Sequence, residues 1–232
     1  MRTAVGARED TAFIFDLDGT LIDSVYQHVL AWSEAFDASG IELSIWRVHR
    51  RIGMSGGLML RALQRELARP IEASTIADLQ AAHRAAYLRR APSVRGLPGA
   101  AALLHALTSA GVPWAIATSG ERAVATAGIA KLGLLEEPRV VVTRDEVAYA
   151  KPNPDLFLAA ADRLGVDIRR AFIVGDSIWD LLAARRAGGL GVGLLSGGYG
   201  RGELERGGAY RVYDDPADLL ARLDELGVRN VG

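Results

Sequence analysis

The fold of this chain follows from Ala12-Phe13-Ile14-Phe15-Asp16-Leu17-Asp18-Gly19-Thr20, an apolar run that ends in a pair of acids. The run fits a buried β-strand that opens into a turn. Side chains two residues apart in an extended segment point to the same side, so the carboxylates of Asp16 and Asp18 can face one reacting centre. One can attack an electrophile while the other gives and takes a proton, which suits phosphoryl or acyl chemistry. These residues alone would equally fit an ordinary polar turn.

Short apolar runs alternate with amphipathic helical patterns from Gly96 onwards. This alternation is typical of an α/β fold with a parallel sheet. We predict strands at residues 12–15, 114–117, 140–143, 172–174, 191–195 and 211–213. The helices between them are expected at residues 100–110, 123–132, 155–164, 179–187 and 216–226. The glycine-rich residues 197–208 are interpreted as a loop.

The segment from residue 24 to residue 94 interrupts the alternation, because it contains helical patterns and no convincing buried strand. We expect helices at residues 25–39, 59–68 and 75–90. Since the alternation begins before this segment and resumes after it, we predict two domains. Residues 1–23 and 95–232 would form the catalytic core, and residues 24–94 an inserted α-helical cap that excludes water and selects substrate. A fixed helical layer of the core is the alternative.

The composition excludes several classes of function. The 232 residues carry a net charge of -1, which gives no overall attraction to nucleic acid or to an anionic membrane, so we expect a small soluble substrate. The absence of cysteine excludes disulfides, thiolate catalysis and cysteine-bound metals. No apolar run reaches membrane-spanning length, and residues 1–11 lack the core of a signal peptide. We therefore expect a cytoplasmic protein with a loose amino-terminal tail; the sequence does not indicate its oligomeric state.

Polar residues follow three further predicted strands, at the edge where open parallel sheets bind ligands. Thr118-Ser119-Gly120 offers hydroxyls and backbone N–H donors that can grip phosphate oxygens. Lys151 lies in a proline-stiffened connection, where its ammonium can neutralise a transferring phosphoryl group. Asp176 and Asp180 stack on one face if a helix has begun by then, and with Asp16 they offer the oxygen ligands that Mg2+ prefers. Singly, these residues also fit a turn, a solvated lysine and a helix cap.

The ordered set D-x-D-G-T, T-S-G, K-P and G-D-S-x-x-D resembles the motifs of the haloacid dehalogenase superfamily of aspartate-nucleophile phosphohydrolases. The likeness covers about residues 12–213, and the nearest group by pattern is the phosphoglycolate phosphatase-like set. It implies a Rossmann-like core with a mobile helical cap. It also implies a Mg2+-dependent phosphatase that acts on a small phosphorylated metabolite.

The same resemblance implies a role for each site residue. Asp16 would attack phosphorus and carry an aspartyl-phosphate, and Asp18 would protonate the leaving oxygen and later activate water. Ser119 would bind the phosphoryl group, and Lys151 would stabilise its charge. The implied ligands of Mg2+ are Asp16, the backbone carbonyl of Asp18, and Asp176, with Asp180 in support.

The β-phosphoglucomutases of the same superfamily share both carboxylates, so a mutase is the alternative to a phosphatase. His28 lies where those mutases also place a histidine, and Arg51 begins a segment that resembles the cap loop that meets substrate. Gly56 stands where the mutases carry a phosphate-binding arginine, which favours the phosphatase. Arg50 or Arg51 could substitute for that arginine, so a sugar-phosphate mutase stays open.

The remaining aromatic residues are interpreted as structural. His49, His83 and His105 show no metal-ligand spacing with one another, and we expect them at the surface. We expect Trp32 to pack against other residues rather than to bind substrate. Trp179, inside the acidic motif, could shape the metal pocket.

Overall fold

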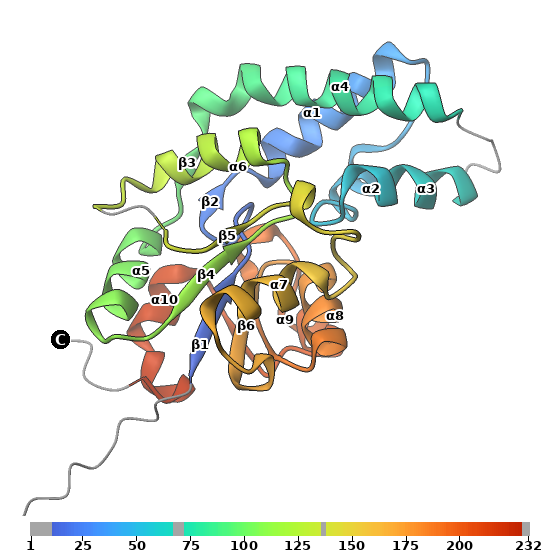
Figure 1. The fold of residues 1–232 in the computed structure, drawn as a ribbon. Coiled ribbons are helices and arrows are strands. Elements are labelled where there is room, and N and C mark those ends of the chain that lie inside the picture. The colour runs from blue at the N-terminus through green and yellow to red at the C-terminus, as the bar shows by residue number, and fades with distance from the viewer. Residues whose placement is uncertain (1–10, 67–71, 136–137, 229–232) are drawn as a thin grey trace, which may run out of the picture.

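The computed structural model describes residues 11–66, 72–135 and 138–228. Its centre is a parallel six-stranded sheet in the order β5-β4-β1-β6-β7-β8 (Figure 1). The strands are β1 (Ala12–Phe15), β4 (Trp114–Ala117), β5 (Val141–Val142), β6 (Ala171–Gly175), β7 (Leu190–Leu194) and β8 (Arg211–Tyr213). This sheet confirms the predicted α/β fold. Strand β1 lies inside the sheet, so the acids that follow it are at the middle of the carboxyl edge.

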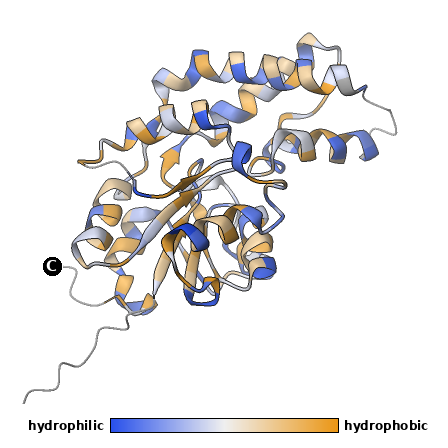
Figure 2. Ribbon diagram, in the orientation of Figure 1, coloured by the Kyte–Doolittle hydropathy of each residue, from blue (hydrophilic) through white to orange (hydrophobic). Residues whose placement is uncertain are grey.

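The two faces of the sheet are both covered by helices, which is why β1 is apolar throughout. Phe13 and Phe15 belong to the apolar cluster on one face, and Ala12 and Ile14 belong to the cluster on the other. The first face is covered by α5 (Ala100–Ser109), α6 (Arg122–Ile129) and α10 (Pro216–Ala221), and the second by α7 (Asp155–Leu164) and α8 (Ile178–Ala187). In Figure 2 the helices carry hydrophobic and hydrophilic residues in alternation, as expected for elements with one face on a core.

Helices α1 (Val25–Ala38), α2 (Ile45–His49), α3 (Gly56–Glu66) and α4 (Ala73–Arg90) lie together on one side of the molecule (Figure 1). They share an apolar cluster of their own, which includes Trp32, Phe36 and Met59. The chain enters these helices through β2 (Ile22–Asp23) and leaves them through β3 (Arg95–Gly96), and the two short strands pair antiparallel. We call residues 24–94 the helical segment; its division from the core as a separate domain stays a prediction.

Several elements lie outside the sequence expectations. Strands β2 and β3 and helix α2 are not predicted, because they contain only two, two and five residues and leave no readable period. Helix α3 begins at Gly56 rather than at residue 59, and the predicted end at residue 68 lies outside the described residues. The predicted amino-terminal tail also lies outside them, apart from residue 11. Within the described residues, no helix combines the length and the apolar character that a bilayer span requires.

The prediction of a loop at residues 197–208 is wrong in part, because Arg201–Gly207 form helix α9. The Glu203 carboxylate accepts a hydrogen bond from the backbone N–H of Gly200 at 2.9 Å, which caps the first turn. Leu204 is fully buried in an apolar cluster with Leu181 and Tyr199. One buried leucine and one capping carboxylate outweigh the helix-breaking tendency of the glycines, about 1 kcal/mol for each interior glycine.

Candidate active site

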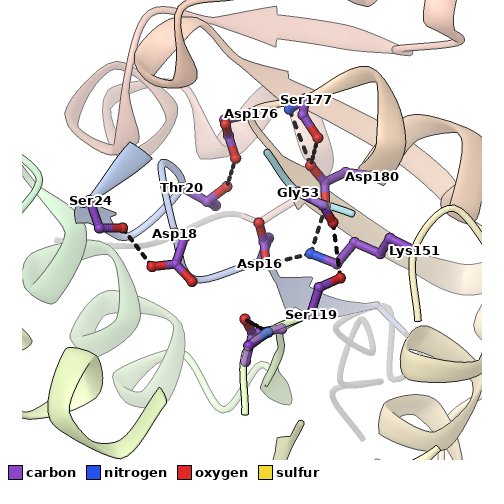
Figure 3. Close-up of polar contacts among 12 residues, drawn as sticks. Asp16, Asp18, Thr20, Ser24, Gly53, Ser119, Lys151, Asp176, Ser177 and Asp180 are labelled. Carbon is purple, nitrogen blue, oxygen red and sulfur yellow. Dashed lines mark hydrogen bonds and ion pairs between the residues drawn. The ribbon is translucent and has the colours of Figure 1, made fainter. Parts of the chain in front are cut away.

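Asp16 is fixed by the sheet itself at the end of β1. Its backbone N–H donates to the Val174 carbonyl of β6 at 2.9 Å, and its side chain is buried. The Nζ of Lys151 pairs with the Asp16 carboxylate and, at 2.8 Å, with that of Asp180 (Figure 3). Burial works to lower the pKa of Lys151, but the charges of the two carboxylates outweigh it and raise that pKa. The lysine is therefore a fixed cation beside Asp16.

Three buried carboxylates converge at this point. Asp16, Asp176 and Asp180 each place one oxygen within 4.8 Å of the others. Burial is the main cause that raises the pKa of Asp16, against the opposing charge of Lys151. Burial, followed by the charge of Asp180, raises the pKa of Asp176 well above its usual range. One lysine supplies a single positive charge against three carboxylates, so the donor set fits a further, divalent cation bound by oxygen.

Asp176 and Asp180 reach the cluster by different routes. Helix α8 begins at Ile178, so Asp176 precedes it, and the condition under which the two acids would stack on one helix face is not met. Asp180 belongs to the capping box of α8: its carboxylate accepts from the Ser177 hydroxyl at 2.5 Å and from the Ser177 N–H at 3.1 Å. The Asp176 carboxylate accepts from the Thr20 hydroxyl at 3.0 Å.

Asp176 also depends on a residue that sequence reasoning missed. A Cβ added to Gly197 would lie 1.8 Å from an oxygen of the Asp176 carboxylate, far inside any real contact. The glycine-rich character of residues 197–208 is the available signal, but on its own it indicates only a loop. The missing side chain at residue 197 is what leaves room for this carboxylate.

Asp18 points away from this cluster and toward the helical segment (Figure 3). Its carboxylate accepts a 2.6 Å hydrogen bond from the Ser24 hydroxyl and lies 3.1 Å from Nε2 of His28. Burial works to raise the pKa of Asp18, but the charge and hydrogen bond of His28, with the bond from Ser24, lower it overall. The structure thus brings His28 to Asp18. The hydrogen bond between Asp18 and Ser24 is, after the close contact of Gly197 with Asp176, the second interaction that the sequence analysis did not predict.

Thr118, Ser119 and Gly120 line a cavity of about 120 Å³ between the core and the helical segment. Asp16, Asp18 and Arg51 line it as well. The Thr118 hydroxyl accepts from the N–H of Gly120 at 3.0 Å, whereas the Ser119 hydroxyl donates to the Gly53 carbonyl at 2.9 Å. Ser119 therefore contacts the helical segment in this structure, and Thr118 is the hydroxyl bonded within its own turn.

One of the expectations for aromatic residues is wrong. His83 is not a surface residue: its ring stacks on Trp32 with centroids 4.1 Å apart, and its Nε2 lies 3.1 Å from Nδ1 of His28. The indole N–H of Trp179 donates to the Arg50 carbonyl at 3.1 Å, and a role of Trp179 in shaping the metal pocket stays a prediction. That same carbonyl accepts from the Tyr199 hydroxyl at 2.9 Å, so two core side chains hold one backbone atom of the helical segment.

The family model for haloacid dehalogenase-like hydrolases matches residues 11–188. The chain is 36% identical over 180 residues to hexitol phosphatase A of Escherichia coli, which covers 76% of this chain and 79% of that protein. It is 35% identical over 214 residues to a phosphoglycolate phosphatase of Rhodospirillum rubrum, with 90% and 88% of the two chains covered. A solved structure of a hydrolase from Pseudomonas syringae is 54% identical with a TM-score of 0.90, over 93% of this chain and 99% of that one.

These matches agree with the carboxylates, hydroxyls and lysine that the fold assembles at the carboxyl edge of the sheet. The chain therefore belongs to the haloacid dehalogenase-like hydrolase family, and it is an enzyme of the phosphatase type.

Proposed function

We propose that this enzyme is a Mg2+-dependent phosphomonoesterase that transfers the phosphoryl group of a small metabolite to Asp16 and then to water. The observation that carries the proposal is the separation of the two motif carboxylates. Asp16 lies with Lys151, Asp176 and Asp180, whereas Asp18 has its own partners. The relatives named hexitol phosphatase and phosphoglycolate phosphatase support a small substrate. The cytoplasmic location stays a prediction from the sequence.

The two carboxylates divide the reaction into two steps. An oxygen of Asp16 forms a bond to phosphorus while the bond from phosphorus to the ester oxygen breaks, and Asp18 gives its proton to that oxygen. Water then gives a proton to Asp18 and attacks phosphorus, which releases Asp16 and inorganic phosphate. The lowered pKa of Asp18 suits the second step. In the first step, the nearby negative charge of the bound ester raises that pKa and favours the protonated acid.

The remaining residues hold and neutralise the phosphoryl group. Lys151, fixed beside Asp16, faces the charge on the phosphoryl oxygens, and Thr118 with Ser119 offers hydroxyl and backbone donors. We assign the divalent cation to Asp16, Asp176 and the backbone carbonyl of Asp18, with Asp180 in support. Mg2+, when bound, adds positive charge next to the transferring group.

We favour hydrolysis over the mutase reaction. Gly56 stands where the resemblance places an arginine for a second phosphate, and a Cβ added there would lie 3.0 Å from the ring of Trp32. A Cβ at residue 56 would require the indole to shift by a few tenths of an ångström. We therefore keep hydrolysis as the proposed reaction.

The test replaces the proposed nucleophile. In Asp16→Asn we expect phosphate release from a panel of sugar, polyol and carboxylic acid phosphates to fall about 10³-fold or more, because an amide oxygen does not attack phosphorus. Circular dichroism and thermal melting check that the variant is folded. Asp37→Asn, at an exposed position of α1, is the control and should retain parental turnover. Chelation with EDTA should stop the parent enzyme, and Mg2+ should restore it.

An Asp16→Asn protein that releases phosphate at the parental rate, once deamidation is excluded by mass spectrometry, would show that another residue is the nucleophile. A parent enzyme that isomerises a hexose 1-phosphate with a bisphosphate activator, and releases little phosphate, would favour the mutase.

A further inference from the structure

We propose that an open groove beside the catalytic cavity binds a second anionic group of the substrate, so that the enzyme prefers esters whose leaving group ends in a distal phosphate or carboxylate. The groove lies between helix α3 of the helical segment and core residues 144–153. We call it the arginine groove, because Arg61, Arg65 and Arg144 line it. The proposal rests on the function proposed above and names the substrate class of that same site.

The arginine groove adjoins the catalytic cavity, since both are lined by Met54, Ser55, Gln80 and Arg144. The catalytic cavity has a volume of about 120 Å³, whereas the groove has about 1100 Å³. A phosphoryl group and the first atoms of a leaving group fill the smaller space. A longer leaving group must therefore extend beyond it, and the groove is the neighbouring space that can receive its far end.

Arg144 lies where the two spaces meet, and its backbone is tied to the phosphate-binding turn. Its N–H donates to the Gly120 carbonyl at 3.0 Å, and its guanidinium donates to the Val147 carbonyl at 2.7 Å. A carbonyl leaves the positive charge of arginine in place, and a guanidinium has five N–H donors, of which this contact uses one. Arg144 thus holds a positive charge between the phosphoryl site and the groove.

Helix α3 supplies the other two positive charges. Leu60 and Leu63 belong to the apolar cluster of the helical segment, whereas Arg61 and Arg65 are exposed and line the groove. Two like charges four residues apart on a helix repel each other. Within the part of the chain that the structure describes, neither guanidinium has a hydrogen-bond or ion-pair partner. An anion bound between them would relieve the repulsion.

The charges around the two spaces favour the groove as the place for a second anion. Among the described residues that line the groove, none is acidic. The catalytic cavity also contains arginines, but there a second anion would lie near the carboxylates of Asp16, Asp18 and Glu121. Guanidinium groups form charge-assisted hydrogen bonds to phosphate and carboxylate oxygens. Tyr149, which is 62% exposed, and Asn153 add uncharged donors to the groove.

The first test varies the distal charge of the substrate. It compares a hexitol monophosphate with the symmetrical hexitol 1,6-bisphosphate, using the parent enzyme and Mg2+. Two equivalent reacting ends account for a factor of about two, and we expect kcat/KM for the bisphosphate to be higher by about tenfold or more. This advantage should shrink as the ionic strength rises from about 0.1 M to about 1 M, because salt screens exposed charges.

The length of the leaving group supplies a control for the place of binding. Ethylene glycol bisphosphate carries its second phosphate only two carbons from the first, so this group stays within the catalytic cavity. Its kcat/KM should exceed that of ethylene glycol monophosphate by no more than the factor of about two that two equivalent ends give.

The second test removes the two charges of α3. In the double variant Arg61→Gln and Arg65→Gln, we expect the ratio of KM for the hexitol bisphosphate to KM for the monophosphate to rise about tenfold. The control is the double variant Arg185→Gln and Arg206→Gln, which removes the same charge at exposed positions that line neither space. It should keep the parental ratio. Thermal melting checks that both variants are folded.

The proposal is overturned if the parent enzyme hydrolyses the hexitol bisphosphate no better than the factor of two allows, or if the folded α3 variant keeps the parental KM ratio. The same change in the control variant would also overturn it, because the effect would then come from net charge. Free sulfate that raises turnover of the monophosphate would show a separate effector site instead. All of these outcomes differ from a failure of the phosphatase proposal, in which the parent enzyme would release no phosphate from any ester.

Discussion

Gly197 lies so close to the carboxylate of Asp176 that no other residue fits there. In Gly197→Ala the new methyl group would overlap the carboxylate oxygen, since the undisplaced distance is 1.8 Å. We expect the side chain of Asp176 to leave the cluster and the affinity for Mg2+ to fall about tenfold or more, as it does when residues that orient metal ligands are changed. Titration calorimetry with Mg2+ measures the loss.

The control for this prediction is Gly200→Ala, a few residues away. A Cβ there meets only the end of Glu203, at 3.5 Å, which is an ordinary contact. This variant should bind Mg2+ like the parent enzyme. Parental affinity in Gly197→Ala would mean that Asp176 does not bind the ion.

Glu146 stabilises the short 3-10 helix Arg144–Glu146, which leads from β5 toward Lys151. Its carboxylate accepts from the Thr143 N–H and hydroxyl, both at 2.9 Å, and from Arg163 at 2.7 Å. Burial works to raise the pKa of Glu146, but these bonds lower it from 4.5 to about 2. The charged form is therefore favoured in the folded state. Its contribution is fully present above about pH 4.5, the value of the unfolded chain, and is lost as the pH falls toward about 2.

We expect Glu146→Gln to lower the free energy of unfolding by about 1 kcal/mol at pH 7, the usual cost of a lost cap. The difference from the parent should shrink as the pH is lowered from about 4.5 toward about 2. Urea denaturation at several pH values measures it. Glu42→Gln, at an exposed position, serves as the control. A difference that stays constant over this pH range would contradict the role of the Glu146 charge.

The elements that the sequence predicts are those with a readable period and a buried partner. Strands at residues 12–15, 114–117 and 211–213 are found with the predicted bounds. The first two are apolar runs between turn residues, and the third buries Val212 and Tyr213 after an exposed Arg211. Helix α9 was missed because its glycines conceal a single buried leucine, Leu204. The convergence of Asp16, Lys151 and Asp176 could be expected, since parallel strands end at one edge. The contacts of Ser24, His83 and Gly197 could not, because they depend on how the helical segment and a distant loop approach that edge.

At the scale of the whole molecule, the carbonyl of Arg50 is one of the points that fasten the helical segment to the core, together with the Gly53 carbonyl bonded by Ser119. Trp179 and Tyr199 both donate to the Arg50 carbonyl, and each such bond contributes about 1 kcal/mol. In the double variant Trp179→Phe and Tyr199→Phe we expect the segment to open more often. KM for a good substrate should rise about tenfold, and limited proteolysis within residues 24–94 should become faster.

Tyr210→Phe, which removes a hydroxyl from a side chain that is 47% exposed, is the control and should leave both measurements unchanged. If the double variant keeps the parental KM and proteolysis rate, these two bonds do not hold the segment closed.

The pairing of β2 with β3 constrains how such opening can proceed. Ile22 lies opposite Gly96, and Asp23 lies opposite Arg95. The two connections between the core and the helical segment therefore form one two-stranded ribbon and not two separate linkers. A two-stranded ribbon bends far more easily perpendicular to its plane than within its plane. The four helices should therefore rotate together about the β2–β3 ribbon. The separation between the helical segment and the core would then increase with distance from this ribbon. Water and substrate would enter and leave on the side opposite the ribbon.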